Sequence, residues 1–373
     1  MKIAFVYDGI YPYTIGGVQK RIWELARRLA QRGHEVTIFG MKHWEGEDII
    51  YKEGVRLWGV CPPQQLFVNS RRSIKAALYF AYKLLLPLLK EKFDVIDAAN
   101  FPYFPCFPAK LASVAKRSQL VITWHEVWNN YWYEYLGKKG FLGKVVERMV
   151  AHLNDKVVAN SEATKRGLET IGVRKEISVI PNGVDVQKAG EIVRSNEGSD
   201  VIYVGRLLKE KNVHLLIKAT GYVKREIPSI RCTIIGDGPE KENLQRLIHQ
   251  LNLRDNTCLK EVAESEEQVF SWMKASKVFV LASVREGFGI TVLEANACGV
   301  PAITVNHPQN AACDLIIDGE NGFICEVSES DIADRILRVM NSEEGWERKC
   351  LEFAKRYDWS GIVDSLEGVY EAG

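Results

Sequence analysis

The sequence has no C-x-x-C pair among its eight cysteines, which lie far apart along the chain. Zinc sites need clustered ligands, and disulfide frameworks are typical of smaller secreted domains. We therefore expect buried, reduced thiols in a cytoplasmic protein without a metal site. The cysteines are Cys61, Cys106, Cys232, Cys258, Cys298, Cys313, Cys325 and Cys350.

The chain also lacks an excess of charge of either sign. Its 49 lysines and arginines and 48 aspartates and glutamates give a formal net charge of +1. A chain so close to neutrality has no overall attraction to nucleic acid, so any anionic partner must be bound by a local patch.

No apolar run is long enough to predict a membrane span. At the N-terminus, Asp8 interrupts the apolar residues too early for a signal peptide. Residues 74–89 are mostly apolar, but Lys75 and Lys83 interrupt them and Pro87 would end or kink a helix.

At 373 residues the chain is longer than one ordinary hydrophobic core requires, which predicts two domains. Strand-like and helix-like runs alternate throughout, and this order predicts an α/β protein with parallel, doubly wound sheets. In the first half we expect a helix at 16–32 and strands at 2–7, 35–39, 95–98, 120–124, 156–159 and 177–180.

The polar segment 185–200 is rich in charged and turn-forming residues, and we expect it to be the linker region. The alternation restarts after it. We therefore predict two Rossmann-like domains, 1–182 and 183–357. The second should contain strands at 201–204, 231–235, 257–259, 278–281 and 301–305, with helices from Asn212, Lys241, about Gln268 and Ile290.

Ligands of doubly wound sheets bind at the carboxyl ends of the strands, and two such edges can face each other across a cleft. In the first half, Gly16 and Gly17 precede a helix whose N–H groups can meet an anion, although such a pair is also typical of a simple tight turn. His125 ends a strand and can bond a sugar hydroxyl or take a proton, although a lone histidine is usually structural.

In the second half, one strand-to-helix loop carries two cations. Gly205 and Arg206 end the strand and Lys211 follows, so a guanidinium fork and an ammonium can both reach a diphosphate. A solvated basic turn explains these residues equally well. Gly236 ends the next strand, in a turn where a base or ribose can pass close to the backbone.

A later loop places two acids around a glycine-rich turn. Glu286 and Glu294 form an E-x7-E pattern, and a helix is expected to begin near Ile290. The backbone amides before this helix can hold a phosphate, and an acid one turn into the helix can accept hydrogen bonds from a ribose diol. The alternative is that the two acids are a helix-capping residue and an exposed helix residue. The turn consists of Gly287, Phe288 and Gly289.

These loops closely resemble those of the GT4-type family of retaining glycosyltransferases with the GT-B fold. The resemblance covers nearly the whole chain in the family's order. It implies two Rossmann-like domains facing across a cleft, with a final helix in 358–373 crossing back onto the first. The similar segments are GGVQKRIWELARRLAQRGHEVTI, VVANSEATKRGL, ISVIPNGVD, VGRLLKEKN, IIGDGPEKENL and EGFGITVLEANACGVPAI.

The resemblance also implies an activity: a retaining hexosyltransferase of carbohydrate biosynthesis that uses a nucleotide-diphosphate-sugar donor. In the family's pattern, Arg206 and Lys211 neutralise the leaving diphosphate, Glu294 binds the ribose and Glu286 contacts the transferred sugar. The sequence contains no D-x-D motif, which fits metal-independent chemistry without a cofactor.

Further site residues follow from the same resemblance. His125 would lie near the donor sugar, and Gly16 and Gly17 would form a flexible loop near the phosphate and the acceptor. The sequence does not identify the nucleotide of the donor, which can be a UDP-sugar or a GDP-sugar. The choice of base would depend on contacts with the backbone near Gly236 and Val262.

The acceptor, a carbohydrate or a lipid-linked molecule, is not identified by the sequence. Asn100 stands where many relatives carry a histidine. Asn100 and the stretch 101–108 would line the acceptor side, so the family's acceptor analogies are not carried over to this chain. The aromatic segment 124–135 either forms an acceptor surface or, as its pattern favours, packs a helix onto the domain. The basic stretch 71–92 can lie on the inner face of an anionic membrane, although a buried helix with a basic edge explains it as well.

Two other functions would use the same pocket. One is a GT-B-like epimerase or hydrolase that acts with water, and the other is a non-catalytic protein that binds a nucleotide sugar. The presence of both acids and both cations favours transfer.

Overall fold

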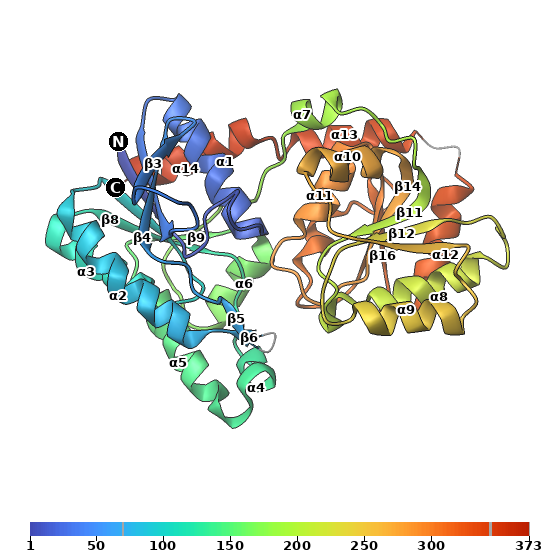
Figure 1. Cartoon of the computed structure of the whole chain (residues 1–373), viewed down its shortest axis with the longest axis horizontal. Helices are drawn as coiled ribbons and strands as arrows, with labels where there is room; N and C mark the ends of the chain where they lie inside the picture. The colour runs from blue at the N-terminus through green and yellow to red at the C-terminus, as the bar shows by residue number, and fades with distance from the viewer. Residues whose placement is uncertain (69–70, 343–344, 373) are drawn as a thin grey trace. The chain divides into compact units, whose positions relative to one another are not determined.

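The computed structural model describes residues 1–68, 71–342 and 345–372, which form two compact units (Figure 1). The N-terminal unit comprises Met1–Asn182 and Trp359–Gly373, and the C-terminal unit is Gly183–Asp358. The chain thus leaves the N-terminal unit once and returns to it with its last helix. Gly373, the last residue of the expected C-terminal segment, lies outside the described residues.

The N-terminal unit is built on an eight-stranded sheet with the order β10-β9-β8-β7-β1-β2-β4-β3. Every pair in it is parallel except the edge pair β3 and β4. Strand order reverses at β1, which places a topological switch point at the carboxyl ends of β1 and β7. The strands are β1 (Lys2–Val6), β2 (Glu35–Met41), β3 (Ile49–Lys52), β4 (Val55–Cys61), β7 (Val95–Ala99), β8 (Gln119–Trp124), β9 (Lys156–Ala159) and β10 (Ile177–Val179).

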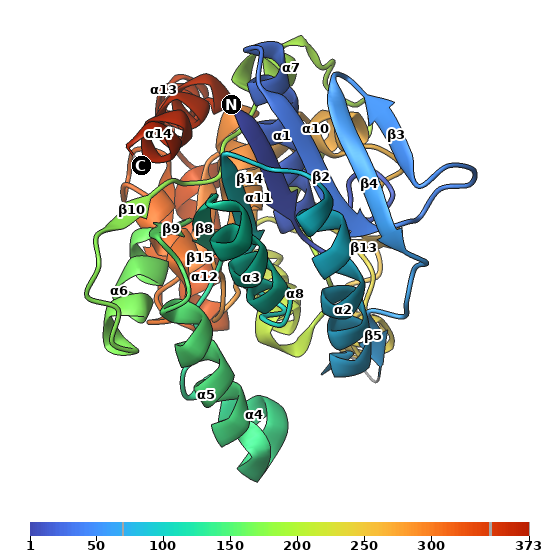
Figure 2. The same cartoon turned by 90° about the vertical axis from the view of Figure 1, so that its left-hand side faces the viewer.

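Helices cover both faces of this sheet, because successive strand residues point to opposite sides. Ile3 and Phe5 pack in a core with α1 and α14, whereas Ala4 and Val6 pack in a second core with the helices of the other face. Figure 2 shows α2, α3 and α5 in front of the sheet. The helices are α1 (Gly17–Gln31), α2 (Ile74–Lys90), α3 (Cys106–Lys116), α4 (Tyr131–Leu136), α5 (Gly140–Ala151), α6 (Glu162–Thr170) and α14 (Trp359–Glu371), with the short turn η1 (Gly137–Lys139) and a ribbon of β5 (Phe67–Val68) and β6 (Arg71–Arg72).

The last helix, α14, is tied to the sheet by a buried hydrogen bond. Tyr370 Oη donates to Asp97 Oδ2 over 2.6 Å, and Thr123 Oγ1 donates to Asp97 Oδ1 over 2.7 Å. All three side chains are buried. Burial raises the pKa of Tyr370, so its hydroxyl remains a donor at neutral pH.

The C-terminal unit has a six-stranded, all-parallel sheet with the order β13-β12-β11-β14-β15-β16. Its order reverses at β11, so the loops after β11 and β14 meet at a second switch point. The strands are β11 (Ser199–Val204), β12 (Cys232–Ile235), β13 (Thr257–Lys260), β14 (Ser276–Leu281), β15 (Ala302–Val305) and β16 (Gly322–Cys325).

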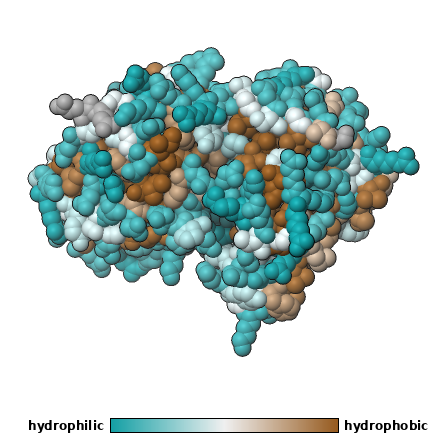
Figure 3. All heavy atoms as spheres, turned by 180° about the vertical axis from the view of Figure 1, so that it is seen from behind, coloured by the Kyte–Doolittle hydropathy of each residue, from teal (hydrophilic) through white to brown (hydrophobic). Residues whose placement is uncertain are grey.

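Helices cover the buried strands of this unit. The face of the protein shown in Figure 3 has hydrophobic patches between hydrophilic areas. The helices are α7 (Val186–Glu191), α8 (Val213–Val223), α9 (Lys241–Gln250), α10 (Glu266–Lys274), α11 (Ile290–Ala297), α12 (Glu329–Met340) and α13 (Trp346–Lys355), with the turns η2 (Lys209–Lys211) and η3 (Ala311–Leu315).

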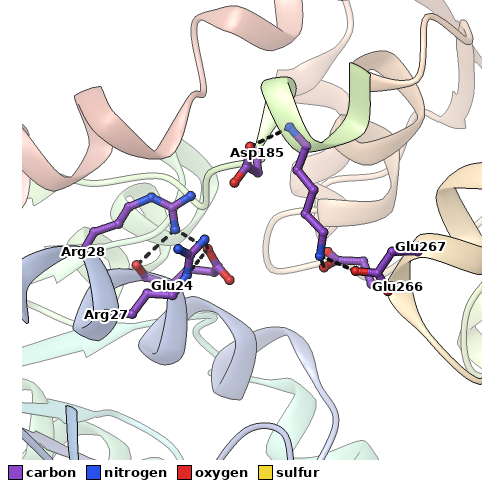
Figure 4. A network of polar contacts seen from close by, with 7 residues as sticks. Glu24, Arg27, Arg28, Asp185, Glu266 and Glu267 are labelled. Carbon is purple, nitrogen blue, oxygen red and sulfur yellow. Dashed lines mark hydrogen bonds and ion pairs between the residues drawn. The ribbon is translucent and has the colours of Figure 1, made fainter. Parts of the chain in front are cut away.

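The segment 185–200, expected to be the linker region, belongs to the C-terminal unit and contains α7 and the first residues of β11. Asp185 caps α7 by accepting a bond from the backbone N of Lys188 over 2.9 Å. Ala189 is fully buried in the core of the C-terminal unit. Lys188 Nζ, in turn, forms ion pairs with two acids of α10, Glu266 (3.1 Å) and Glu267 (2.6 Å) (Figure 4).

Ion pairs within a single helix occur on α1. Glu24 accepts bonds from Arg27, with the nitrogen and oxygen 2.6 Å apart, and from Arg28 (Figure 4). The spacings of three and four residues place these side chains on one side of the helix.

The cysteines form no disulfide, and all eight lie within the described residues. Six are buried, as expected, but Cys258 is exposed, and Cys313 is only partly buried. Cys258 lies on β13, the edge strand of its sheet, where one strand neighbour is missing.

Replacing Tyr370 with phenylalanine tests how α14 is held. In Tyr370→Phe the buried Asp97 loses one of its two side-chain donors, so we expect the free energy of unfolding to fall by about 1–3 kcal/mol. Urea denaturation measures this. The control Tyr82→Phe, whose ring is 77% exposed, should change stability by less than about 0.5 kcal/mol. Equal stability of the two variants would contradict the assigned anchoring.

Candidate functional site

The loops after β11 and β14 are hydrogen-bonded to each other at the switch point of the C-terminal unit. Val284 N donates to Glu210 O over 3.1 Å, and Ser283 Oγ donates to the same oxygen over 3.4 Å. Because β11 and β14 are parallel neighbours, their carboxyl ends deliver both loops to one edge of the sheet.

Lys211 and Glu286 meet where these loops join. Lys211 Nζ donates to Glu286 Oε1 over 2.5 Å, and the two side chains are 19% and 14% exposed. The backbone of Glu286 is fixed on both sides, since its N–H donates to Gln309 O over 2.9 Å and its carbonyl accepts from Ala311 N over 3.0 Å. The sequence placed these two residues on separate loops and did not predict their contact.

Arg206 lies on the same loop as Lys211, five residues before it. Its carbonyl accepts a bond from Tyr203 Oη over 3.0 Å, which fixes the backbone just after β11. Its side chain is exposed. A fixed backbone with an exposed guanidinium can bind an anion that reaches the loop from solvent.

Gly236 and Gly205 lie back to back at the ends of β12 and β11. Gly205 N donates to Ile235 O over 3.0 Å, and a Cβ added at Gly236 would lie 1.9 Å from Gly205 O. Only glycine allows this approach. Gly236 is therefore needed to bring the two loops together, in addition to any contact with a ligand.

The turn before α11 offers backbone amides. Gly289 occupies the N-cap position with φ 91°, a left-handed conformation suited to glycine, and no side chain caps the helix. The uncapped first turn is therefore a potential anion site. Gly287, at the start of this turn, follows Glu286 directly.

Phe288 and Ile290 flank Gly289 and pack inward. Phe288 is 6% exposed and makes an edge contact with Tyr357, with ring centroids 6.2 Å apart. Ile290 is partly buried against the same core. The sequence assigned a role only to the backbone amides of these two residues, and that role stays a prediction.

The two acids of the E-x7-E pattern are neither a helix-capping acid nor an exposed helix residue. Glu294 is 7% exposed, so it is not an exposed helix residue. Glu286 does not cap α11, because its carboxylate binds Lys211 and the helix has no side-chain cap.

Val262 lies farther along the sheet than the other predicted site residues of this unit. It is 56% exposed on the loop after β13, and β12 separates β13 from β11. A base reaching it would extend along the sheet edge past Gly236.

In the N-terminal unit, Gly16 and Gly17 begin α1. Gly16 has an extended backbone at the N-cap and provides no side-chain cap, and Gly17 is the first helical residue. A Cβ at Gly16 would lie 2.5 Å from Gln19 Oε1, whereas one at Gly17 would meet nothing within 4 Å. The uncapped start of α1 can accept an anion.

Sequence reasoning missed a buried ion pair beside this loop. Asp8 lies two residues after the end of β1, is 0% exposed and binds Arg72. Burial raises the pKa of Asp8, and the charge of Arg72 opposes that shift. A charged residue close after a buried strand was the available signal, but its partner lies 64 positions away.

His125 follows β8, and its backbone N donates to Asn100 Oδ1 over 3.1 Å. The residue lines a cavity of about 10 Å³ together with Arg21 and Thr123. Burial and the positive charge of Arg21 lower the pKa of His125 to about 3. The ring is therefore neutral at physiological pH and suited to hydrogen bonding rather than to ion pairing.

Arg21 is a second residue that sequence reasoning missed. It is 1% exposed on α1, and its Nη2 donates to Ile180 O over 2.8 Å. Its Nη1 donates to Asn182 Oδ1 over 3.0 Å and also to Pro181 O. Arg21 thus ties α1 to the last residues before the chain enters the C-terminal unit. An arginine on the apolar face of an amphipathic helix was the signal.

The aromatic segment packs into the N-terminal unit. Trp128 and Trp132 are each 7% exposed, with ring centroids 4.6 Å apart, and Phe101 stacks on Trp128 at 5.0 Å. Packing therefore explains these indoles. Tyr103, in the stretch expected to line the acceptor side, is 2% exposed, so that expectation is wrong for this residue.

Within residues 1–68, 71–342 and 345–372, no group of three or more His, Cys, Asp or Glu side chains could hold a metal ion. No helix in the same part of the chain is long and apolar enough to cross a bilayer.

Comparison with known families identifies the chain. Residues 15–188 match the family Glycosyltransferase Family 4, and residues 187–357 match Glycosyl transferases group 1. The protein is a GT4-type glycosyltransferase. This assignment disfavours the epimerase, hydrolase and non-catalytic alternatives.

Individual proteins agree with this assignment. The glycosyltransferase is 23% identical to one component of the phosphatidylinositol N-acetylglucosaminyltransferase of Arabidopsis thaliana, over 100% of this chain and 82% of that one. Its fold matches sucrose-phosphate synthase from Thermosynechococcus elongatus with a TM-score of 0.83 and 18% identity, over 100% and 98% of the chains. It also matches Anabaena HepE in complex with UDP-glucose, with a TM-score of 0.77 and 18% identity over 100% of both chains. The two Rossmann-like units are thus those of the GT-B fold.

Substituting Gly236 tests the close approach of the two loops. In Gly236→Ala the new methyl group collides with the carbonyl of Gly205, so we expect a loss of about 1–3 kcal/mol in the free energy of unfolding. Urea denaturation is the measurement. The control Gly361→Ala, in α14 with nothing within 4 Å of the added atom, should gain up to about 1 kcal/mol. If Gly236→Ala had the same free energy of unfolding as the wild type, the two loops would not need the close approach of Gly236 to Gly205.

The depressed pKa of His125 predicts a pH dependence of stability. Between about pH 6.5 and pH 3 the unfolded chain protonates this ring and the folded chain does not, so acidification favours unfolding by up to about 1.4 kcal/mol per pH unit. His125→Gln should therefore lose stability less steeply than the wild type as pH falls from about 6.5. Urea denaturation at several pH values, with exposed His152→Gln as control, measures the slopes. Parallel slopes for the His125 variant and the wild type would contradict the shift.

Proposed function

We propose that this glycosyltransferase transfers a sugar from a nucleotide-diphosphate-sugar donor with retention of the anomeric configuration and without a metal ion. The observation that carries the proposal is the Lys211–Glu286 pair at the switch point, directly before the uncapped start of α11. The two loops after β11 and β14, which are hydrogen-bonded to each other, thus carry an ammonium, a carboxylate and helix amides.

The cations of this site would stabilise the leaving diphosphate. Breaking the anomeric bond creates an oxocarbenium-like sugar and adds negative charge to the diphosphate. Fixed donors aimed at developing charge lower such a barrier because they need little reorganisation during the reaction. Lys211, Arg206 and the first turn of α11 would supply these donors, so the chemistry would not require a metal.

The acids would orient the donor. Glu286 would accept bonds from hydroxyl groups of the transferred sugar, and its contact with Lys211 would keep that sugar beside the diphosphate. Glu294, one turn into α11 and 7% exposed, would accept a bidentate bond from the ribose diol. His125, neutral at physiological pH, would bond a hydroxyl group of the transferred sugar.

The donor would be a UDP-sugar or a GDP-sugar. UDP-glucose bound to HepE, which has the same fold, supports a uridine nucleotide. The acceptor would be a carbohydrate or a lipid-linked molecule, and the phosphatidylinositol in the name of one relative supports the second class.

Removing either member of the Lys211–Glu286 pair tests the proposal. A thermal-shift screen of UDP- and GDP-sugars first identifies the donor, because a ligand stabilises the native state by RT ln(1 + [L]/Kd). With that donor, Lys211→Ala and Glu286→Ala should lower the rate of nucleotide release in the presence of acceptor by at least about 10²-fold. Lys211→Ala should do so because the diphosphate loses a cation in the transition state.

The control is Lys209→Ala, which removes an exposed lysine from the same turn. It should retain the wild-type rate. Chelation of metals should leave the rate unchanged, and NMR of the product should show the donor's anomeric configuration. Near-wild-type turnover of either pair variant would contradict the assigned roles, and an inverted product would contradict retention.

A further inference from the structure

Helix α2 exposes an apolar stripe to solvent. Ile74, Leu78, Tyr82 and Leu86 recur every four residues and are 54%, 48%, 77% and 70% exposed. A helix on a water-exposed surface normally carries polar side chains at such positions. The other exposed side chains of α2 are its lysines, Lys75, Lys83 and Lys90.

Helix α3 packs beside α2 and continues this surface. Its Leu111 and Val114 are 61% and 66% exposed. Between the two helices lies an open groove of about 580 Å³, whose walls include Leu78, Phe104 and Phe107, and Lys83 also lines it. The apolar surface is therefore continuous from one helix to the next.

Helix α5 lies on the same face of the sheet (Figure 2). It exposes Phe141, Leu142, Val145 and Met149, each about half exposed at 50–53%. Arg148 is exposed beside them, and Lys138 and Lys139 are exposed in the turn before the helix. This third helix thus repeats the combination of apolar and basic side chains. We call the exposed side chains of α2, α3 and α5 the apolar-basic face.

The apolar-basic face has no exposed acid, and all residues of its three helices are described. Glu147, the one acid in these helices, is 0% exposed and accepts a bond from Tyr103 Oη over 2.9 Å. Two nearby acids have cationic partners: Glu91 binds Arg56 over 2.8 Å, and Asp155 binds Lys110 over 3.0 Å. Glu134, on α4 beside α5, is an exposed acid outside these helices. The face is positive although the whole chain carries a net charge of only +1.

We propose that the apolar-basic face binds the surface of an anionic lipid bilayer. Apolar side chains bordered by lysines match the boundary between acyl chains and anionic headgroups, where the apolar groups insert and the ammonium groups contact phosphates. A second copy of the chain would present the same positive charge and be repelled. The contact is peripheral, and it does not depend on the proposed donor chemistry, so either can fail without the other.

Vesicle co-sedimentation tests the proposal with the full chain. At low salt the wild type should pellet with phosphatidylcholine vesicles that contain phosphatidylglycerol, and much less with phosphatidylcholine alone. Lys75→Gln/Lys83→Gln should weaken binding about 25-fold, because each lysine near an anionic surface contributes about fivefold in affinity. Ile74→Asp/Leu86→Asp should abolish binding, since inserted apolar groups become charged.

Matched controls lie on the C-terminal unit. Val193→Asp changes an apolar side chain that is 81% exposed, and Lys355→Gln removes an exposed lysine. Both should bind vesicles like the wild type. All variants should keep the wild-type melting temperature, which shows that lost binding is not unfolding.

Three results would overturn the proposal. The first is no co-sedimentation of the wild type at low salt, and the second is equal binding by the face variants and their controls. The third is a dimer in gel filtration that Ile74→Asp/Leu86→Asp converts to a monomer, because the face would then bind a second copy of the chain.

Discussion

The hydrogen bond between Val284 N and Glu210 O joins the two loops of the C-terminal switch point, and the candidate site depends on that junction. The reversed strand order brings the ends of β11 and β14 side by side, and the bond fixes the register of their loops. Only then can Lys211 reach Glu286 over 2.5 Å. The glycine at 236 serves the same end, because any side chain there would push away the loop that begins at Gly205.

The N-terminal unit positions its helices by buried polar contacts rather than by loop junctions. Arg21 binds the backbone at Ile180, and Asp97 receives Tyr370 of the returning helix. Burying such groups is costly unless each is hydrogen-bonded, so these contacts specify where α1 and α14 lie on the sheet. His125 borders the same buried groups, which explains why its ring remains neutral.

Much of the fold could be predicted because buried parallel strands form short apolar runs between amphipathic helices. β9 has the bounds 156–159 that the sequence predicts, and α9 and α11 begin at the expected Lys241 and Ile290. The hairpin of β3 and β4 was missed, because its half-exposed edge strand gives no clear apolar run. α7 was missed because six residues, three of them polar, carry too little periodicity.

The sequence by itself determined the family, the alternation of strands and helices, and which loops carry the acids, cations and glycines, since these features depend on local pattern and on motif order. Only the tertiary structure decided that Lys211 binds Glu286, that Asp8 binds Arg72, and that the lysines of α2 share a face with apolar groups of α3 and α5. Contacts between distant positions arise from strand order and helix packing. A linear pattern of residues does not contain that information.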